Sequence, residues 1–224
     1  MRLDAVQFEP ITAAGSPRGT VLFADLRGYT AMAERLAPPY LASLLDDFFN
    51  ILTQAAEKNG GKVYHTAGDS LMAGFGLKAA DGGGAAPALA ASRAMLESFS
   101  ALAERWRSEA QIEAGLGIGL HLGPVAIAEF GPASRRIETL VGDTANVAAR
   151  LCSRARAGEV LFSCTVAAAL EAQALRADSA FLHLPRYEMR GRREPLDIWC
   201  IPASGVRSPL HALHIVVDPR SAGR

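Results

Sequence analysis

The sequence predicts an α+β fold with a ferredoxin-like βαββαβ core and additional strands. Segments with strand and helix periodicity follow one another in the order strand, helix, two hairpin strands, helix, strand. The chain has 224 residues, half of them hydrophobic, which favours one domain with extensions over two domains. We therefore expect an N-terminal extension over residues 1–17, a folded domain over 18–203 and a C-terminal tail over 204–224.

The first half of this core is predicted over residues 18–75. A strand over 18–25 contains the β-favouring run Val21-Leu22-Phe23. A helical pattern from 30 to 58 follows, interrupted by Pro38-Pro39 and closed by Asn59-Gly60-Gly61. The next two extended segments, 62–66 and 71–75, bracket Gly68-Asp69 and predict a β-hairpin.

The second half begins after a glycine-rich loop at 81–84. Pro87 suits the first turn of a helix whose apolar face is formed by Leu89, Leu96, Phe99, Ala103 and Trp106. Strands are predicted over 117–123 and 137–141, with an extended segment over 124–130 between them. A helix begins after Gly142-Asp143-Thr144, the segment 166–174 is helical, and 160–162, 198–201 and 211–217 are further strands.

Two aspartates stand where buried segments end. Asp25 closes the first strand beside the Leu26-Arg27-Gly28 turn, and Asp69 occupies the tip of the hairpin. If the hairpin pairs beside the first strand, the two carboxylates converge next to exposed backbone amides. Such a site suits Mg²⁺ ions that hold a polyphosphate, because Mg²⁺ prefers carboxylate and substrate oxygens. Each aspartate taken alone is also a common turn or cap residue.

Composition excludes several classes of function. The formal net charge is zero and no polybasic face is evident, so we expect no nucleic-acid partner. The three cysteines, Cys152, Cys164 and Cys200, are odd in number and lack C-x-x-C spacing, which favours buried free thiols in a reducing, cytoplasmic setting. No segment approaches the ~20 apolar residues of a membrane span, so we expect no membrane segment in this chain.

Four motifs together resemble the catalytic domain of class III nucleotidyl cyclases, over about residues 18–201. They occur in the order found in that family, and the third is long and specific. The motifs are Phe23-Ala24-Asp25-Leu26-Arg27-Gly28-Tyr29-Thr30, Gly68-Asp69-Ser70, Val141-Gly142-Asp143-Thr144-Ala145-Asn146-Val147-Ala148-Ala149-Arg150-Leu151, and Arg190-Gly191-Arg192.

The resemblance implies a two-metal mechanism that forms a 3′,5′-cyclic nucleotide and pyrophosphate from a nucleoside triphosphate. Asp25 and Asp69 would hold two Mg²⁺ or Mn²⁺ ions, and Leu26 would add a backbone carbonyl. Amides near Gly28, Tyr29 and Thr30 would bind phosphate oxygens.

A second group of residues corresponds to catalytic positions on a helix. Asn146 and Arg150 are spaced i, i+4, and they resemble the family's ribose-orienting asparagine and transition-state arginine. The alternative is an exposed helix pair without a catalytic role. Arg190, or less favourably Arg192, falls where the family places a cation on the terminal phosphates.

Several other polar residues are expected to have structural and not catalytic roles. Asp143 is expected to cap the helix that begins there. His121, between apolar neighbours, is expected to be a core histidine with its hydrogen bonds satisfied. Loop charges are expected to be solvated at Arg135, Arg136, Arg192 and Arg193.

Base recognition departs from the family pattern. Four residues before Asp69, adenylate cyclases carry a lysine and guanylate cyclases a glutamate, whereas this chain has His65. Thr139 falls where adenylate cyclases use an aspartate or threonine, which favours ATP. GTP or a pyrimidine triphosphate stays open, because a neutral imidazole both donates and accepts hydrogen bonds.

The resemblance also implies a head-to-tail homodimer. In this family the metal aspartates come from one subunit and the asparagine and arginine from the other, and this chain holds both sets. One alternative is a catalytically silent nucleotide-binding or dimerisation module, which His65 would support. A second is a dinucleotide-forming cyclase, which the absence of a G-G-[DE]-E-F run opposes.

Overall fold

A computed structural model describes residues 17–77, 82–132, 134–173, 181–192 and 194–203. Residues 1–16 of the expected N-terminal extension and the whole expected tail, including the strand expected at 211–217, lie outside these ranges. The expected domain boundaries therefore stay predictions.

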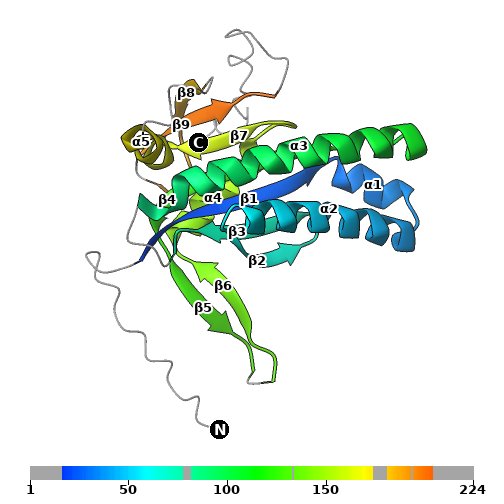
Figure 1. Cartoon of the computed structure of the whole chain (residues 1–224), viewed down its shortest axis with the longest axis horizontal. Coiled ribbons are helices and arrows are strands. Elements are labelled where there is room, and N and C mark those ends of the chain that lie inside the picture. The colour runs from blue at the N-terminus through cyan, green and yellow to red at the C-terminus, as the bar shows by residue number, and fades with distance from the viewer. Residues whose placement is uncertain (1–16, 78–81, 133, 174–180, 193, 204–224) are drawn as a thin grey trace, which may run out of the picture.

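A seven-stranded mixed sheet forms the centre of the molecule (Figure 1). Its order is β2(Lys62–Ala67), β3(Ser70–Phe75), β1(Arg18–Arg27), β4(Gly115–Pro124), β7(Val160–Ser163), β9(Leu196–Ile201) and β8(Leu182–Tyr187). Neighbouring strands among the first four are antiparallel, which is the arrangement of a βαββαβ ferredoxin-like core and confirms the predicted fold class. Strand β7 adds in parallel beside β4, and β9 and β8 extend the sheet in antiparallel fashion.

Helices α2(Pro38–Lys58) and α3(Ala85–Ala110) cover one face of this sheet. The expected interruption before Pro38 is real, since a separate helix α1(Tyr29–Arg35) ends there. A short 3₁₀ turn at Gly82–Gly84 precedes α3, whose first turn contains Pro87 as predicted. Helix α5(Cys164–Ala172) packs onto the same core through Val166, Ala167 and Leu170.

Helix α4(Asp143–Arg154) packs against the opposite face of the sheet. The pattern of β4 explains how it fits. Even-numbered residues of β4, Leu116, Ile118, Leu120 and Leu122, belong to the α2 and α3 core, while the odd-numbered positions, which point to the other face, are Gly115, Gly117, Gly119, His121 and Gly123. A Cβ on Gly119 would lie 2.1 Å from the Cys152 amide nitrogen and 2.3 Å from the Ala148 carbonyl oxygen. The glycines therefore let the helix backbone approach the strand directly.

Strands β5(Ala126–Phe130) and β6(Ile137–Val141) form a separate hairpin that projects from the body (Figure 1). The base of this arm is fixed, because Leu140 is buried against the sheet and Lys62 pairs with Glu138. Toward solvent it exposes the large hydrophobic side chains Ile127, Phe130, Ile137 and Val141.

The three cysteines are free, with Cys152 and Cys200 buried and Cys164 half-buried. Within the described ranges, no helix has the length and hydrophobicity required to cross a lipid bilayer.

Candidate active site

The structure brings Asp25 and Asp69 together at one end of the sheet. Asp25 pairs with Ser70 across β1 and β3, and the Leu26 amide donates to the Asp69 carbonyl oxygen at 3.0 Å. The pKa of Asp25 is raised, chiefly because burial disfavours its charged form; Arg27 lowers it, and the negative charge of Asp69 raises it further. The two carboxylates therefore share one electrostatic environment, as the hairpin pairing predicted.

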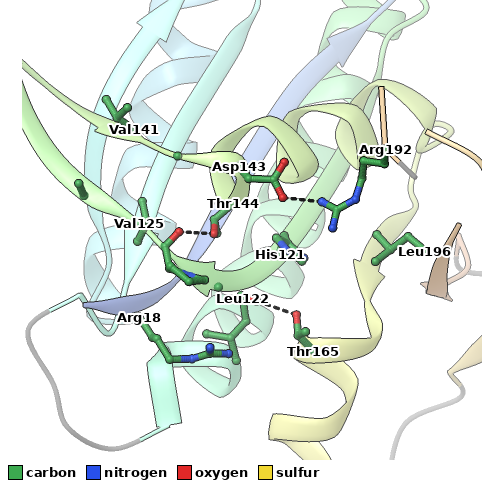
Figure 2. A pocket seen from close by; sticks show the side chains of 14 residues that line it. Arg18, His121, Leu122, Val125, Val141, Asp143, Thr144, Thr165, Arg192 and Leu196 are labelled. Carbon is green, nitrogen blue, oxygen red and sulfur yellow. Dashed lines mark hydrogen bonds and ion pairs between the residues drawn. The ribbon is translucent and has the colours of Figure 1, made fainter. Parts of the chain in front are cut away.

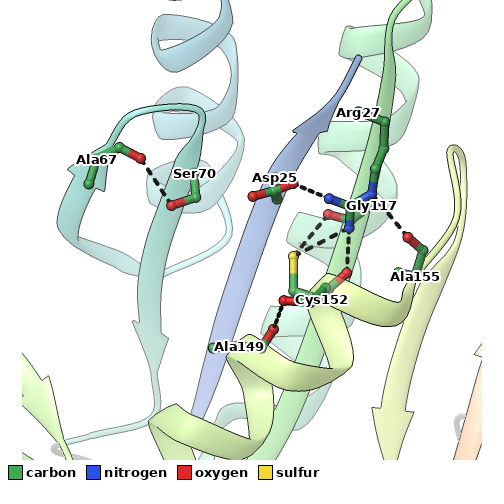
Figure 3. A network of polar contacts seen from close by, with 9 residues as sticks. Asp25, Arg27, Ala67, Ser70, Gly117, Ala149, Cys152 and Ala155 are labelled. Atoms are coloured by element: carbon green, nitrogen blue, oxygen red, sulfur yellow. Dashed lines mark hydrogen bonds and ion pairs between the residues drawn. The ribbon is translucent and has the colours of Figure 1, made fainter. Parts of the chain in front are cut away.

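Asp25 is held by Arg27, a residue that the sequence did not single out. The Arg27 guanidinium donates from Nη1 to Asp25 Oδ1, from Nη2 to the Cys152 carbonyl and from Nε to the Ala155 carbonyl at 3.0 Å (Figure 3). It lies over Gly117, where a Cβ would come within 2.4 Å of Nη2. Because Cys152 and Ala155 lie at the end of α4, Arg27 satisfies terminal helix carbonyls and joins this helix to the aspartate. The i, i+2 spacing of Asp25 and Arg27 on one strand face is the signal that could have revealed the pair.

The donor chemistry here fits Mg²⁺ or Mn²⁺. Among the described residues, no group of three or more acidic, histidine or cysteine side chains could enclose a metal ion. Two adjacent carboxylates suit a hard cation that keeps waters and binds substrate phosphates, which is the habit of Mg²⁺ in nucleotide enzymes.

Backbone amides are available beside the carboxylates. Gly28 has φ 93° and a Cβ there would lie 2.8 Å from the Glu113 carbonyl, so this turn requires glycine. Helix α1 begins at Tyr29, and amides in the first turn of a helix lack partners within it. The predicted phosphate-binding positions Gly28, Tyr29 and Thr30 therefore follow Asp25 closely along the chain, where β1 ends and α1 begins.

Asn146 and Arg150 lie on exposed positions of α4. The Arg150 Nη1 donates to the backbone carbonyl of Arg190, so the structure brings the predicted residues Arg150 and Arg190 together. The contact uses the main chain of Arg190, and Arg190 is an exposed residue.

A β-bulge determines where His65 points. Odd-numbered and even-numbered strand residues normally alternate between faces, but the β2–β3 register shifts between Val63 and His65. His65 therefore pairs with Met72, which packs on the α4 face, the face that also carries Asp25. Thr139 lies on β6, whose base is tied to β2 by the Lys62–Glu138 pair.

One of the structural explanations was wrong. Asp143 does not cap α4, because Gly142 is the N-cap and no side chain caps the helix; Asp143 instead pairs with Arg192 Nη1 at 2.5 Å. Arg192 is an exposed loop residue as expected, and this ion pair is an additional contact. His121 is a core histidine as expected, 7% exposed, with Nδ1 2.7 Å from Ser163 Oγ.

Comparison with known proteins agrees with this geometry. The family model "Adenylate and Guanylate cyclase catalytic domain" matches residues 12–202. An adenylate cyclase of Anabaena cylindrica is 32% identical over 149 residues, which is 63% of this chain and 28% of that protein. The chain therefore spans under a third of this relative.

Solved structures of cyclases share the fold. The adenylyl cyclase CyaB from P. aeruginosa superposes with a TM-score of 0.75 and 26% identity, covering 85% of this chain and 96% of that one. The guanylyl cyclase Cya2 gives a TM-score of 0.72 at 24% identity, over 87% and 98% of the two chains. The family-model match, the sequence motifs and the fold agree. The chain belongs to the class III adenylate and guanylate cyclase catalytic domain family.

Proposed function

We propose that this domain converts ATP to 3′,5′-cyclic AMP and pyrophosphate at a site shared between two copies of the chain. The observation that carries the proposal is the adjacency of Asp25 and Asp69 beside the turn that begins α1. Family membership supplies the reaction class, and both adenylate and guanylate cyclases stand among the related proteins.

In the proposed reaction, Asp25, Asp69 and the Leu26 carbonyl would hold two divalent ions, which would supply activation of the ribose 3′-hydroxyl and neutralisation of the triphosphate charge. Amides at Gly28, Tyr29 and Thr30 orient the phosphate oxygens. Asn146 orients the ribose, Arg150 stabilises charge on the α-phosphate, and Arg190 binds the terminal phosphates. These side chains position substrate and charge without forming a covalent intermediate.

A second copy of the chain is the proposed partner. Arg150 is directed to the Arg190 loop of its own chain, while Asp25 is held by its own Arg27. The projecting β5–β6 arm exposes Phe130, at 53%, and Ile137, at 50%. Apolar side chains on a protruding hairpin favour burial against another subunit. A twofold arrangement then gives two equivalent sites.

ATP is the proposed substrate, with His65 and Thr139 recognising its base. The bulge turns His65 onto the face that carries Asp25, and an imidazole and a hydroxyl can each donate and accept. Two such groups reject a wrong base only weakly, because neither leaves a strict donor or acceptor unpaired. GTP and pyrimidine triphosphates are the alternative substrates.

The test is pyrophosphate release from ATP, GTP, CTP and UTP with Mg²⁺ or Mn²⁺, with products identified by mass. We expect cyclic AMP as the main product, loss of activity in chelator, and a loss of at least about 10³-fold in Asp25→Ala. Asp46→Ala, an exposed acid on α2, is the matched control and should leave turnover unchanged. A different dominant product would replace ATP as the substrate.

A catalytically silent nucleotide-binding module is the second candidate, favoured by His65 at the usual lysine or glutamate position. A silent module would bind nucleotide but release no pyrophosphate from any of the four triphosphates. That result would overturn the enzymatic proposal.

A further inference from the structure

A pocket of about 470 Å³ lies at the other end of β1 from Asp25. It opens between the start of α4, the end of β4 and the start of α5 (Figure 2). Its polar lining is formed by Arg18, His121, Asp143, Thr144, Thr165 and Arg192. Of the residues that the family motifs assign to substrate or metal, Arg192 alone lines this pocket, and it is the less favoured alternative to Arg190.

A chain of hydrogen bonds behind the pocket has a fixed direction. His121 Nδ1 lies 2.7 Å from Ser163 Oγ, Ser163 Oγ lies 2.9 Å from Thr165 Oγ1, and Thr165 Oγ1 donates to the Leu122 carbonyl at 2.7 Å. The carbonyl can only accept, so the single hydroxyl hydrogen of Thr165 is committed to it. Ser163 must therefore donate to Thr165, and His121 must donate from Nδ1–H to Ser163.

This direction fixes the chemistry of the other ring nitrogen. Burial, together with the charges of Arg192 and Arg18, lowers the pKa of His121 to about 4, against the smaller opposing effect of Asp143, so the ring is neutral near pH 7. A neutral imidazole with its hydrogen on Nδ1 has a lone pair on Nε2. Nε2 lies 3.6 Å from the position of a Cβ on Gly123, a lining residue without a side chain, so the lone pair opens into the pocket.

Cationic groups complete the lining. Arg192 gives one hydrogen bond to Asp143 and keeps further donors, and the Arg18 guanidinium forms no hydrogen bond or ion pair with the described residues. Thr144 donates its hydrogen to the Pro124 carbonyl at 2.5 Å, so it offers no donor to a ligand. The pocket therefore combines two guanidinium groups with one carboxylate, that of Asp143, and one buried acceptor, so it keeps one net positive charge.

We propose that this pocket binds a small oxyanion that carries its own hydrogen, namely inorganic phosphate or the monoanion of a phosphate monoester, with its charge on Arg18 and Arg192 and its O–H donated to His121 Nε2. Charged oxygens satisfy the guanidinium donors. The acceptor requires a ligand hydrogen, which sulfate lacks at neutral pH. Apolar lining from Leu122, Val125 and Leu196 leaves room for the organic part of a monoester.

The experiment is calorimetric titration of the full chain at pH 6.5, without metal or nucleotide, using inorganic phosphate, glycerol phosphate and sulfate at equal ionic strength. We expect phosphate to bind at least about tenfold more tightly than sulfate, because sulfate would leave Nε2 unpaired. Tighter binding of glycerol phosphate would identify a monoester as the ligand, and equal or weaker binding would identify the free ion. Equal binding of phosphate and sulfate would overturn the assignment of the acceptor.

Variants separate this pocket from the catalytic phosphate positions. Arg18→Gln should weaken phosphate binding by about tenfold or more, whereas Arg105→Gln, which removes an exposed arginine of α3, should not. Arg150→Ala should retain phosphate binding. Loss of binding in Arg150→Ala with retention in Arg18→Gln would place the anion at the catalytic site and refute the proposal. The proposal does not depend on cyclase activity.

Discussion

His121 couples the stability of the domain to pH. Its pKa falls from 6.5 to about 4 in the fold, chiefly through burial. Below pH 6.5 the unfolded chain binds a proton that the folded chain refuses, so stability is complete above pH 6.5 and falls as the pH drops toward 4. Between pH 6.5 and 5 this amounts to about 2 kcal/mol.

We expect His121→Gln to lack this part of the pH dependence, measured as the difference in free energy of unfolding between pH 6.5 and pH 5. His183→Gln is the matched control, because His183 is exposed and no buried imidazole is removed. The comparison is made within each protein, so a general loss of stability in His121→Gln does not affect it. An unchanged slope in His121→Gln would contradict the assigned pKa.

Among single residues, the sequence predicted those whose role follows from local position. Asp25 at a strand end and Asp69 at a hairpin tip follow from chain order, and the structure places them together. Arg27 and Arg192 could not be predicted in the same way. Their partners, at the end of α4 and at Asp143, lie far along the chain, and only tertiary packing brings them close.

Among the elements, β4 and α4 depend most strictly on small residues. We expect Gly119→Ala to destabilise the domain by about 3 kcal/mol, because its Cβ would overlap backbone atoms of α4 that cannot move independently. Gly60→Ala is the control, since φ is +76° there and nothing lies within 4 Å of the added Cβ. It should cost only about 1 kcal/mol of backbone strain. Urea unfolding of both variants measures the difference, and equal losses would show that contact with α4 is not the cause.

Periodicity predicted the core strands and helices but not every element or detail. Strand β8 alternates poorly between buried and exposed residues, with Leu184 its one buried residue, so its residue pattern does not predict a strand. The bulge in β2 is a second example. Strict alternation would turn His65 away from the α4 face, and no residue type in this segment signals the register shift.

At the scale of the whole molecule, the proposed dimer makes a prediction about mixed chains. Asp25→Ala and Arg150→Ala should each be inactive alone, since each lacks one half of every site. Mixing them should restore up to about a quarter of wild-type activity, because random pairing makes half of the dimers mixed and each mixed dimer has one intact site. Metal-dependent pyrophosphate release measures the recovery. Absence of rescue, with dimers confirmed by light scattering, would refute the shared site.

Arg27 gives such a dimer a further property. One end of its guanidinium holds Asp25 and the other holds the end of α4, the helix that carries Arg150. In a head-to-tail dimer, Asp25 and Arg150 of one chain would belong to different catalytic centres. The same side chain then connects the two centres through one subunit. Negative or positive cooperativity between the two centres would thus originate inside each subunit rather than at the contact between subunits.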